Sequence, residues 1–315
     1  MIKVKSAFKR VPLVLWFVLL LVVVFSFMSE QYLTSRNLLI LLQQGAVLLV
    51  VASAATFVII SGGLDLSLGA ILTVSGVMTA LALNAGVPVP VVILVGGASG
   101  FICGALNGFL ISYCKLQSFI VTLGTQGIFY GISLVATNRI GIQVTHPGFI
   151  MLGSLINKTI PMAAICCLII YIFAIVVQDR TKLGRYLYAI GGNAEGARLS
   201  GIKVNFWKWM VYAFAGMLTG LASVILVSRL EVADPLVGAK WEFEAIAATI
   251  LGGTSLNIGK GDVKGTIVGV ALLTVIRSGL NVIRIPSLWQ PAIIGTVIIL
   301  AIVFQVTISS KELKK

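Results

Sequence analysis

The chain has 315 residues, of which 58% are hydrophobic and only 10% are charged, and its formal net charge is +13. A soluble domain of this length would have about one charged residue in four, so a soluble fold is excluded. The apolar excess also excludes a disordered chain and a disulfide-rich secreted domain. Because backbone polar groups in lipid must be satisfied within the chain, we expect an all-α polytopic membrane protein.

Ten segments approach the pattern of a membrane-spanning helix, which needs about 20 mostly apolar residues. The eighth is too short for an unbroken, untilted span. We treat residues 1–315 as a single transmembrane domain. The segments lie at 11–28, 38–60, 69–85, 89–113, 119–137, 160–177, 208–228, 244–258, 266–283 and 291–309.

The positions of Lys and Arg predict the orientation of these segments. If the N-terminus is inside and all ten segments cross, sixteen of the 23 Lys and Arg residues lie on the inner side. Because such residues are enriched in cytoplasmic loops, both termini are expected in the cytoplasm, and the positive charge does not indicate nucleic acid. The connection 178–207 is then cytoplasmic, and the loop 138–159 is external.

The segment "IISGGLDLSLGAIL" places Asp65 between Gly62 and Gly63 on one side and Gly69 on the other. A carboxylate at the centre of a spanning helix costs about 2.5–3.5 kcal/mol. The glycines free the backbone to leave helical geometry, and a helix restarting near Ser67 would direct its N–H groups toward the carboxylate. Two interpretations follow: Asp65 caps a helix, or it contacts substrate or a gating element.

The fourth segment carries Gly100, Gly104 and Gly108 at every fourth position, which makes one flat helix face. Such faces let membrane helices approach closely, so we expect a tight helix contact there. Polar side chains inside the fourth, fifth and ninth segments either line a solute pathway or hydrogen-bond to a neighbouring helix. These side chains are Asn107, Gln126 and Asn281.

Arg277 lies inside the ninth segment, about two turns before Arg284. A long cationic side chain near a span end commonly reaches the interface, and we expect that behaviour first. An ion pair with Glu242 or Glu244, in the segment that precedes it, is the second interpretation.

No arrangement of reactive side chains predicts an enzyme. The only histidine, His146, has no acidic or cysteine companion nearby, and the four cysteines lack metal-ligand spacing. The stretch "GGTSLNIGKG" at 252–261 has one residue too many for a Walker A motif, and Gly261 stands where Ser or Thr is required. We therefore expect no catalytic residue, metal site or cofactor on this chain, and any ATP hydrolysis on a separate polypeptide.

A short sequence echo links the two halves of the chain. The stretch "GGLDLSLG" at 62–69 returns as "GGTSLNIG" at 252–259. Paired glycine-interrupted segments in two halves of a transporter indicate a substrate pathway, although glycine-rich helices also produce chance matches. We expect interrupted helices near 59–69 and 251–265, and a possible internal repeat. The glycines of the second copy are Gly252, Gly253 and Gly259.

Five separated motifs resemble, in order and over nearly the full length, the permease subunits of bacterial ABC importers for ribose, xylose, galactose and related monosaccharides. One departure is Ser118, where that family usually has proline. The motifs are "ISGGLDLSLG" (60–69), "GALNGFLISY" (104–113), "FIVTLGTQGIFYG" (119–131), "LGRYLYAIGGNAEGARLSGIKV" (183–204) and "AIAATILGGTSLNIGKGDVKGT" (245–266).

The resemblance implies a multi-pass protein of the bacterial cytoplasmic (inner) membrane that works by alternating access. It implies three partners: a second permease copy or close relative, a cytoplasmic ATPase subunit with two modules, and a periplasmic or extracellular sugar-binding protein. Two alternatives stay open. One is an ABC permease for branched-chain amino acids or nucleosides, and the other is an ion-coupled secondary transporter that uses Asp65.

The resemblance also implies that 178–207 is the loop that couples the permease to its ATPase. Within it "EGARLSG" at 195–201 partly matches the EAA-type pattern of importer permeases, with Gly196 where the pattern has Ala. A short helix with small residues can seat in a groove of a partner and pass rigid-body motion to the spans. The residues expected to couple are Gly184, Arg185, Asn193, Glu195, Ala197, Arg198 and Gly201.

Overall fold

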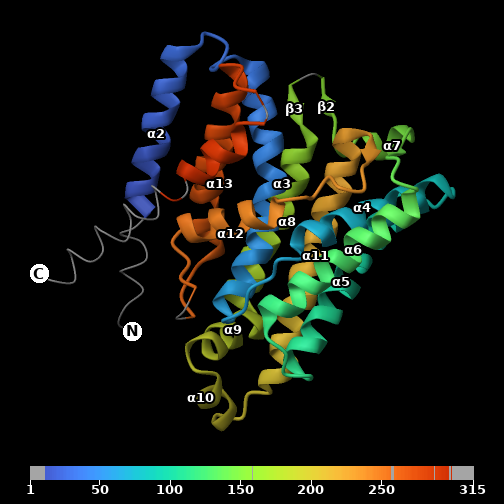
Figure 1. Ribbon diagram of the computed structural model, residues 1–315, viewed down its shortest axis with the longest axis vertical. Coiled ribbons are helices and arrows are strands. Elements are labelled where there is room, and N and C mark those ends of the chain that lie inside the picture. The colour runs from blue at the N-terminus through green and yellow to red at the C-terminus, as the bar shows by residue number, and fades with distance from the viewer. Residues whose placement is uncertain (1–10, 158, 257–258, 287, 298, 300–315) are drawn as a thin grey trace, which may run out of the picture.

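The computed structural model describes residues 11–157, 159–256, 259–286, 288–297 and 299 (Figure 1). Helices dominate this part of the chain, and residues 290–297 are helical as well. The helices are α2 (Val11–Met28), α3 (Ser35–Ile60), α4 (Leu68–Asn84), α5 (Val89–Ser112), α6 (Ser118–Thr137), α7 (Pro147–Ile150), α8 (Met162–Arg180), α9 (Lys182–Gly192), α10 (Ala194–Leu199), α11 (Val204–Leu230), α12 (Trp241–Leu251) and α13 (Val263–Val282).

Six of these helices are long and apolar enough to cross a membrane, namely α3, α5, α6, α8, α11 and α13. Two shorter apolar helices cover residues 14–28 and 68–84. The expectation of an all-α polytopic membrane protein is therefore confirmed. The tenth expected segment is helical where it begins, and its residues 298 and 300–309 lie outside the described residues. The number of ten crossings stays a prediction.

The eighth expected segment forms α12, which has only 11 residues. At about 1.5 Å of rise per residue it reaches about 16 Å, roughly half of the hydrocarbon thickness of a bilayer. It packs against α3 and α13. Hydroxyl groups join the three helices in the interior: Thr56 of α3 lies 3.1 Å from Thr249 of α12 and 2.8 Å from Thr266 of α13.

Glycine lets α5 and α11 pack with their backbones in contact. A Cβ atom on Gly104 of α5 would overlap the backbone of Tyr212 and press on Gly216 of α11. A Cβ on Gly100 would overlap the carbonyl of Gly216, and one on Gly220 would overlap the carbonyl of Gly96. The close contact expected for the glycine face of the fourth segment is confirmed, and its partner is α11.

Both expected interruptions are present. Helix α3 ends at Ile60, and Gly62 takes a φ of +77°, while its N–H donates to the Ile59 carbonyl. Helix α12 ends at Leu251, and Gly253 takes a φ of +95°, while its N–H donates to the Ile250 carbonyl. A left-handed glycine ends both helices. Gly62 and Gly253 thus occupy equivalent positions, each two residues after the end of its helix. The sequence echo aligned Gly62 with Gly252, one residue earlier.

The loop 138–159 is short and partly ordered by strands. β1 (Ile142–Gln143) pairs antiparallel with β4 (Val232–Ala233), and β2 (Leu155–Ile156) pairs antiparallel with β3 (Ile160–Pro161). In Figure 1, β2 and β3 lie at the upper end of the helix bundle, and α9 and α10 lie at the lower end. The loop 138–159 and the segment 178–207 are therefore at opposite ends of the molecule.

Candidate pathway and coupling sites

Asp65 lies in the interruption between α3 and α4 and is only 2% exposed. Its Oδ1 accepts hydrogen bonds from the backbone N–H of Ser67 (2.8 Å) and from the Ser67 hydroxyl (2.6 Å). Asn107 of α5 donates in turn to Ser67 Oγ at 2.7 Å. The structure thus brings Asp65 and Asn107 together through one serine, while Asp65 Oδ2 and Asn107 Oδ1 make no hydrogen bond among the described residues.

The first two turns of α6 supply further hydrogen bonds to the interruption. The N–H of Leu64 donates to Ser118 Oγ at 3.2 Å, and the N–H of Leu66 donates to Thr122 Oγ1 at 3.1 Å. Buried non-helical backbone needs such partners, because its N–H groups have none within a helix. Ser118, which departs from the resembled family pattern, supplies an acceptor that a proline side chain cannot.

Gln126 contacts a different buried acid. Its Nε2 donates to Glu242 Oε1 at 2.7 Å, which ties α6 to the first turn of α12. Glu242 is 2% exposed, and its Oε2 makes no hydrogen bond among the described residues. A Cβ on Gly69 would overlap that oxygen and the Gly238 carbonyl, so Gly69 is needed for a close approach.

The remaining polar candidates lie apart from Asp65. Asn281 is exposed near the end of α13, where its Oδ1 accepts from Gln290 at 2.8 Å. Arg277 forms an ion pair with Glu244 of α12, and both side chains are partly buried. The second interpretation of Arg277 is the one that the structure supports. A cavity of about 350 Å³ lies beside this pair and also has Lys240 and Gln290 in its wall.

The segment 178–207 contains α9 and α10, joined at Asn193, which caps α10 by accepting from the Gly196 N–H at 2.9 Å. Glu195 and Arg198 form an exposed ion pair at 2.6 Å. The Arg198 hydrogen bond holds the pKa of Glu195 below its ordinary value, so the carboxylate stays charged. Gly201 ends this helix with a φ of +82°.

The expected coupling residues divide into two groups by exposure. Arg185, Asn193, Glu195, Arg198 and Gly201 are exposed and available to a partner. Gly184 and Ala197 are buried within the chain, where Gly184 permits the tight turn from α8 into α9, because a Cβ there would overlap the Gln178 carbonyl. One exposed apolar side chain has no signal in the sequence motifs: Leu199, at the end of α10, is 74% exposed.

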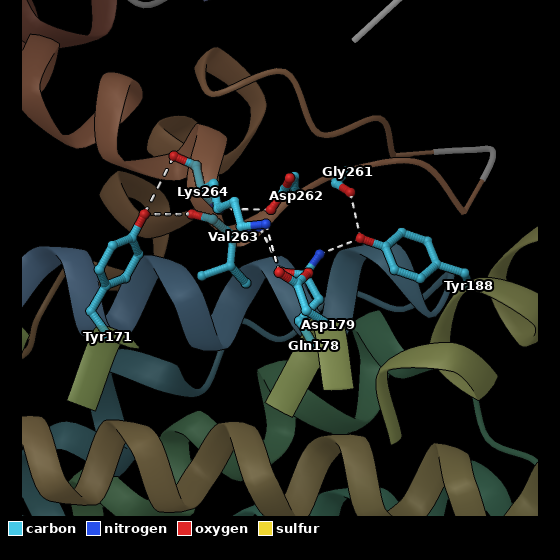
Figure 2. Close-up of polar contacts among 8 residues, drawn as sticks. All are labelled: Tyr171, Gln178, Asp179, Tyr188, Gly261, Asp262, Val263 and Lys264. Atoms are coloured by element: carbon cyan, nitrogen blue, oxygen red, sulfur yellow. Dashed lines mark hydrogen bonds and ion pairs between the residues drawn. The ribbon is translucent and has the colours of Figure 1, made fainter. Parts of the chain in front are cut away.

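Helix α9 contacts both interruptions. A Cβ on Gly191 would overlap the Ile60 carbonyl at the end of α3 and press on Gly259 after α12. Polar contacts then join α8 and α9 to the start of α13 (Figure 2). We call this set the α13 junction. It consists of Tyr171, Gln178, Asp179 and Tyr188 on α8 and α9, and of Gly261, Asp262, Val263 and Lys264 at the start of α13.

Comparison with known proteins identifies the family. Residues 37–302 match the family described as "Branched-chain amino acid transport system / permease component". The chain belongs to this permease family. The ribose import permease protein RbsC of Bacillus subtilis (strain 168) is 40% identical to it over 285 residues, which are 90% of this chain and 88% of that protein.

Other relatives of the permease also carry sugar names. The D-allose transport system permease protein AlsC of Escherichia coli (strain K12) is 37% identical over 254 residues, 80% of this chain and 78% of that protein. The galactose/methyl galactoside import permease protein MglC of the same strain is 33% identical over 267 residues, 78% of this chain and 79% of that protein. The resemblance based on five motifs is confirmed, whereas no solved structure matches the chain.

The α13 junction was not expected from the permease sequence. From the sequence, Gln178 and Tyr188 belong only to the loop 178–207, and Tyr171 belongs to an apolar span. A weak signal was available, because Gln178 is a polar residue in the last turn of an apolar helix. The structure shows that Gln178 is 3% exposed and that both its amide nitrogen and its amide oxygen are hydrogen-bonded.

Proposed function

We propose that this chain is the membrane-spanning subunit of an ATP-driven importer of a monosaccharide of the ribose class. ATP hydrolysis takes place on a separate ATPase subunit with two modules, and a sugar-binding protein delivers the solute from outside. Two permease copies, or a copy and a close relative, form the pathway between them. No cofactor is needed on this chain.

One structural observation supports this proposal above the others. Helix α9 touches both interruptions, while α10, directly after it, presents exposed Glu195, Arg198 and Leu199. A subunit that is moved by a partner needs an exposed helix for the partner to bind, and α10 is such a helix. It also needs a connection from that helix to the interrupted segments, and α9 provides it. We propose ten crossings with both termini in the cytoplasm, a topology that would put α10 on the ATPase side.

The identity of the cargo is proposed from the relatives. The family description mentions branched-chain amino acids, but the relatives at 33–40% identity are named for ribose, allose and galactose. Five-carbon and six-carbon sugars have many hydroxyl groups, and a pathway for them needs amide and carboxylate partners. We propose Asp65, Asn107 and Gln126 as groups that line the pathway or control its gate, and Asn281 as a further lining group.

The test is uptake by the reconstituted permease with and without its ATPase subunit and binding protein. We expect labelled ribose, allose or galactose to accumulate only when ATP and all subunits are present. Leucine and a nucleoside serve as cargo controls, and accumulation of either in place of sugar would contradict the monosaccharide proposal. Uptake by the permease alone, collapsed by an ionophore, would instead establish the ion-coupled alternative.

A further inference from the structure

The first backbone N–H groups of α13 are divided between its own cap and a side chain from another helix. The first N–H groups of any helix lack partners within the helix. Asp262 accepts from the Lys264 N–H at 2.8 Å, and its carbonyl accepts from Gly265 at 3.0 Å. The Val263 N–H donates instead to Gln178 Oε1 at 2.9 Å. The start of α13 is therefore held by the last turn of α8.

Gln178 uses the other end of its amide to hold α9. Its Nε2 donates to the Tyr188 hydroxyl, which donates in turn to the Gly261 carbonyl at 2.7 Å. One hydroxyl thus joins α8, α9 and the interruption before α13, as Figure 2 shows. A tyrosine hydroxyl has one proton to donate and can accept at the same time, so both of its roles here are satisfied.

The other buried side chains of α9 make contacts of another kind. Leu183, Leu187 and Ile190 pack without directional preference, while the backbone at Gly184 and Gly191 lies against neighbouring carbonyl groups. Apolar contacts of this kind permit small sliding movements between packed helices. The hydrogen bonds of Gln178 and Tyr188 have a defined geometry and fix α9 relative to the start of α13.

We infer that Gln178 and Tyr188 are positioning residues that transmit a displacement of α9 and α10 to the start of α13. This inference rests on the proposed function, because the displacement comes from the ATPase subunit. A movement of α9 pulls the Gly261 carbonyl through Tyr188, and the Val263 N–H through Gln178. Helix α13 therefore tilts relative to the interruption after α12. Without the link, α9 still binds and moves with its partner, but α13 follows it less faithfully.

The test measures sugar uptake and ATP hydrolysis in the same proteoliposomes, with the complete complex. Tyr188→Phe removes the hydroxyl and keeps the ring, so we expect normal assembly and continued ATP hydrolysis. The number of sugar molecules moved per ATP should fall about fivefold, the effect of losing one ordinary hydrogen bond from a conformational equilibrium. Gln178→Leu breaks both contacts and should lower the ratio further.

A matched control is Tyr113→Phe at the end of α5, where the tyrosine is exposed and outside the α13 junction. This variant should keep the wild-type ratio. A Tyr188→Phe complex with the wild-type ratio would overturn the inference. Uptake and ATP hydrolysis that fall in parallel would also overturn it, because they would show a role in folding or assembly alone. If wild-type uptake needs no ATP, the proposed function itself fails, which the unmodified complex reveals separately.

Discussion

The α5–α11 contact and the α13 junction hold the permease together in different ways. In the first, glycines bring two helix backbones together, and no side chain lies between Gly104 and Gly216. In the second, side chains from α8 and α9 reach across to backbone groups at the start of α13. Close-packed backbones resist displacement, because a small shift creates overlap or a void. The hydrogen bonds of the second region fix α9 only to the start of α13, so α13 can tilt when α9 moves, and this region suits transmission of movement.

The largest loss of stability is expected where the glycine contact is broken. Gly104→Ala places a methyl group against the Tyr212 carbonyl and should reduce the free energy of unfolding by about 3 kcal/mol. Gly124→Ala is the matched control, because a Cβ at Gly124 on α6 meets nothing within 4 Å. Thermal unfolding of both variants in detergent measures the difference. Equal melting temperatures would show that α5 and α11 are not in backbone contact.

A smaller loss is expected at the interruption between α3 and α4. Asp65→Ala leaves the Ser67 N–H and hydroxyl without their acceptor, at a cost of about 2 kcal/mol. Asp65→Asn keeps one oxygen as acceptor and should retain most of the stability. Sugar uptake by the Asn variant then separates the two interpretations of Asp65. Normal uptake identifies a cap, and a stable variant without uptake identifies a role in substrate contact or gating.

The Lys264–Asp179 ion pair, which is the exposed part of the α13 junction, should contribute little to the free energy of unfolding. Lys264 Nζ lies 2.6 Å from Asp179 Oδ2, but both side chains are more than one-third exposed. An ion pair of this kind contributes about 0–1 kcal/mol and weakens with added salt. Lys264→Met should therefore leave the melting temperature and the uptake per ATP nearly unchanged. A loss as large as that of Tyr188→Phe would mean that the ion pair, and not the buried link, transmits movement.

The two variants of the α10 surface differ in their expected effect on stability: Glu195→Lys should leave it nearly unchanged, whereas Gly201→Trp strains a backbone position with a φ of +82° and lowers it. Glu195→Lys replaces the acid of a fully exposed ion pair, and Gly201→Trp places a bulky side chain at a left-handed position that ends α10. Both should reduce co-purification of the ATPase subunit and sugar uptake, while Glu195→Gln serves as the milder control. Normal binding and transport by both variants would remove the coupling role from this segment.

The helix positions followed from the sequence because lipid imposes a local requirement. A long apolar run must satisfy its own backbone hydrogen bonds, and the first expected span, 11–28, coincides with α2. The interruption at Asp65 was equally local, since glycines and a carboxylate stand within one turn of each other. The Gly100, Gly104 and Gly108 face was recognised for the same reason, although its partner helix was not.

The contacts that give these elements a function involve residues far apart in the chain. Gln126 and Glu242 are separated by 116 residues, and Tyr188 and Gly261 by 73. Periodicity reports which face of a helix is apolar, but it does not report which distant helix covers that face. The membrane-protein class, the apolar helices and their interruptions thus depend on residues that are neighbours in the sequence. The link from α9 to α13 exists only because folding places Gln178, at the end of α8, beside the Val263 N–H, which has no partner within α13 itself.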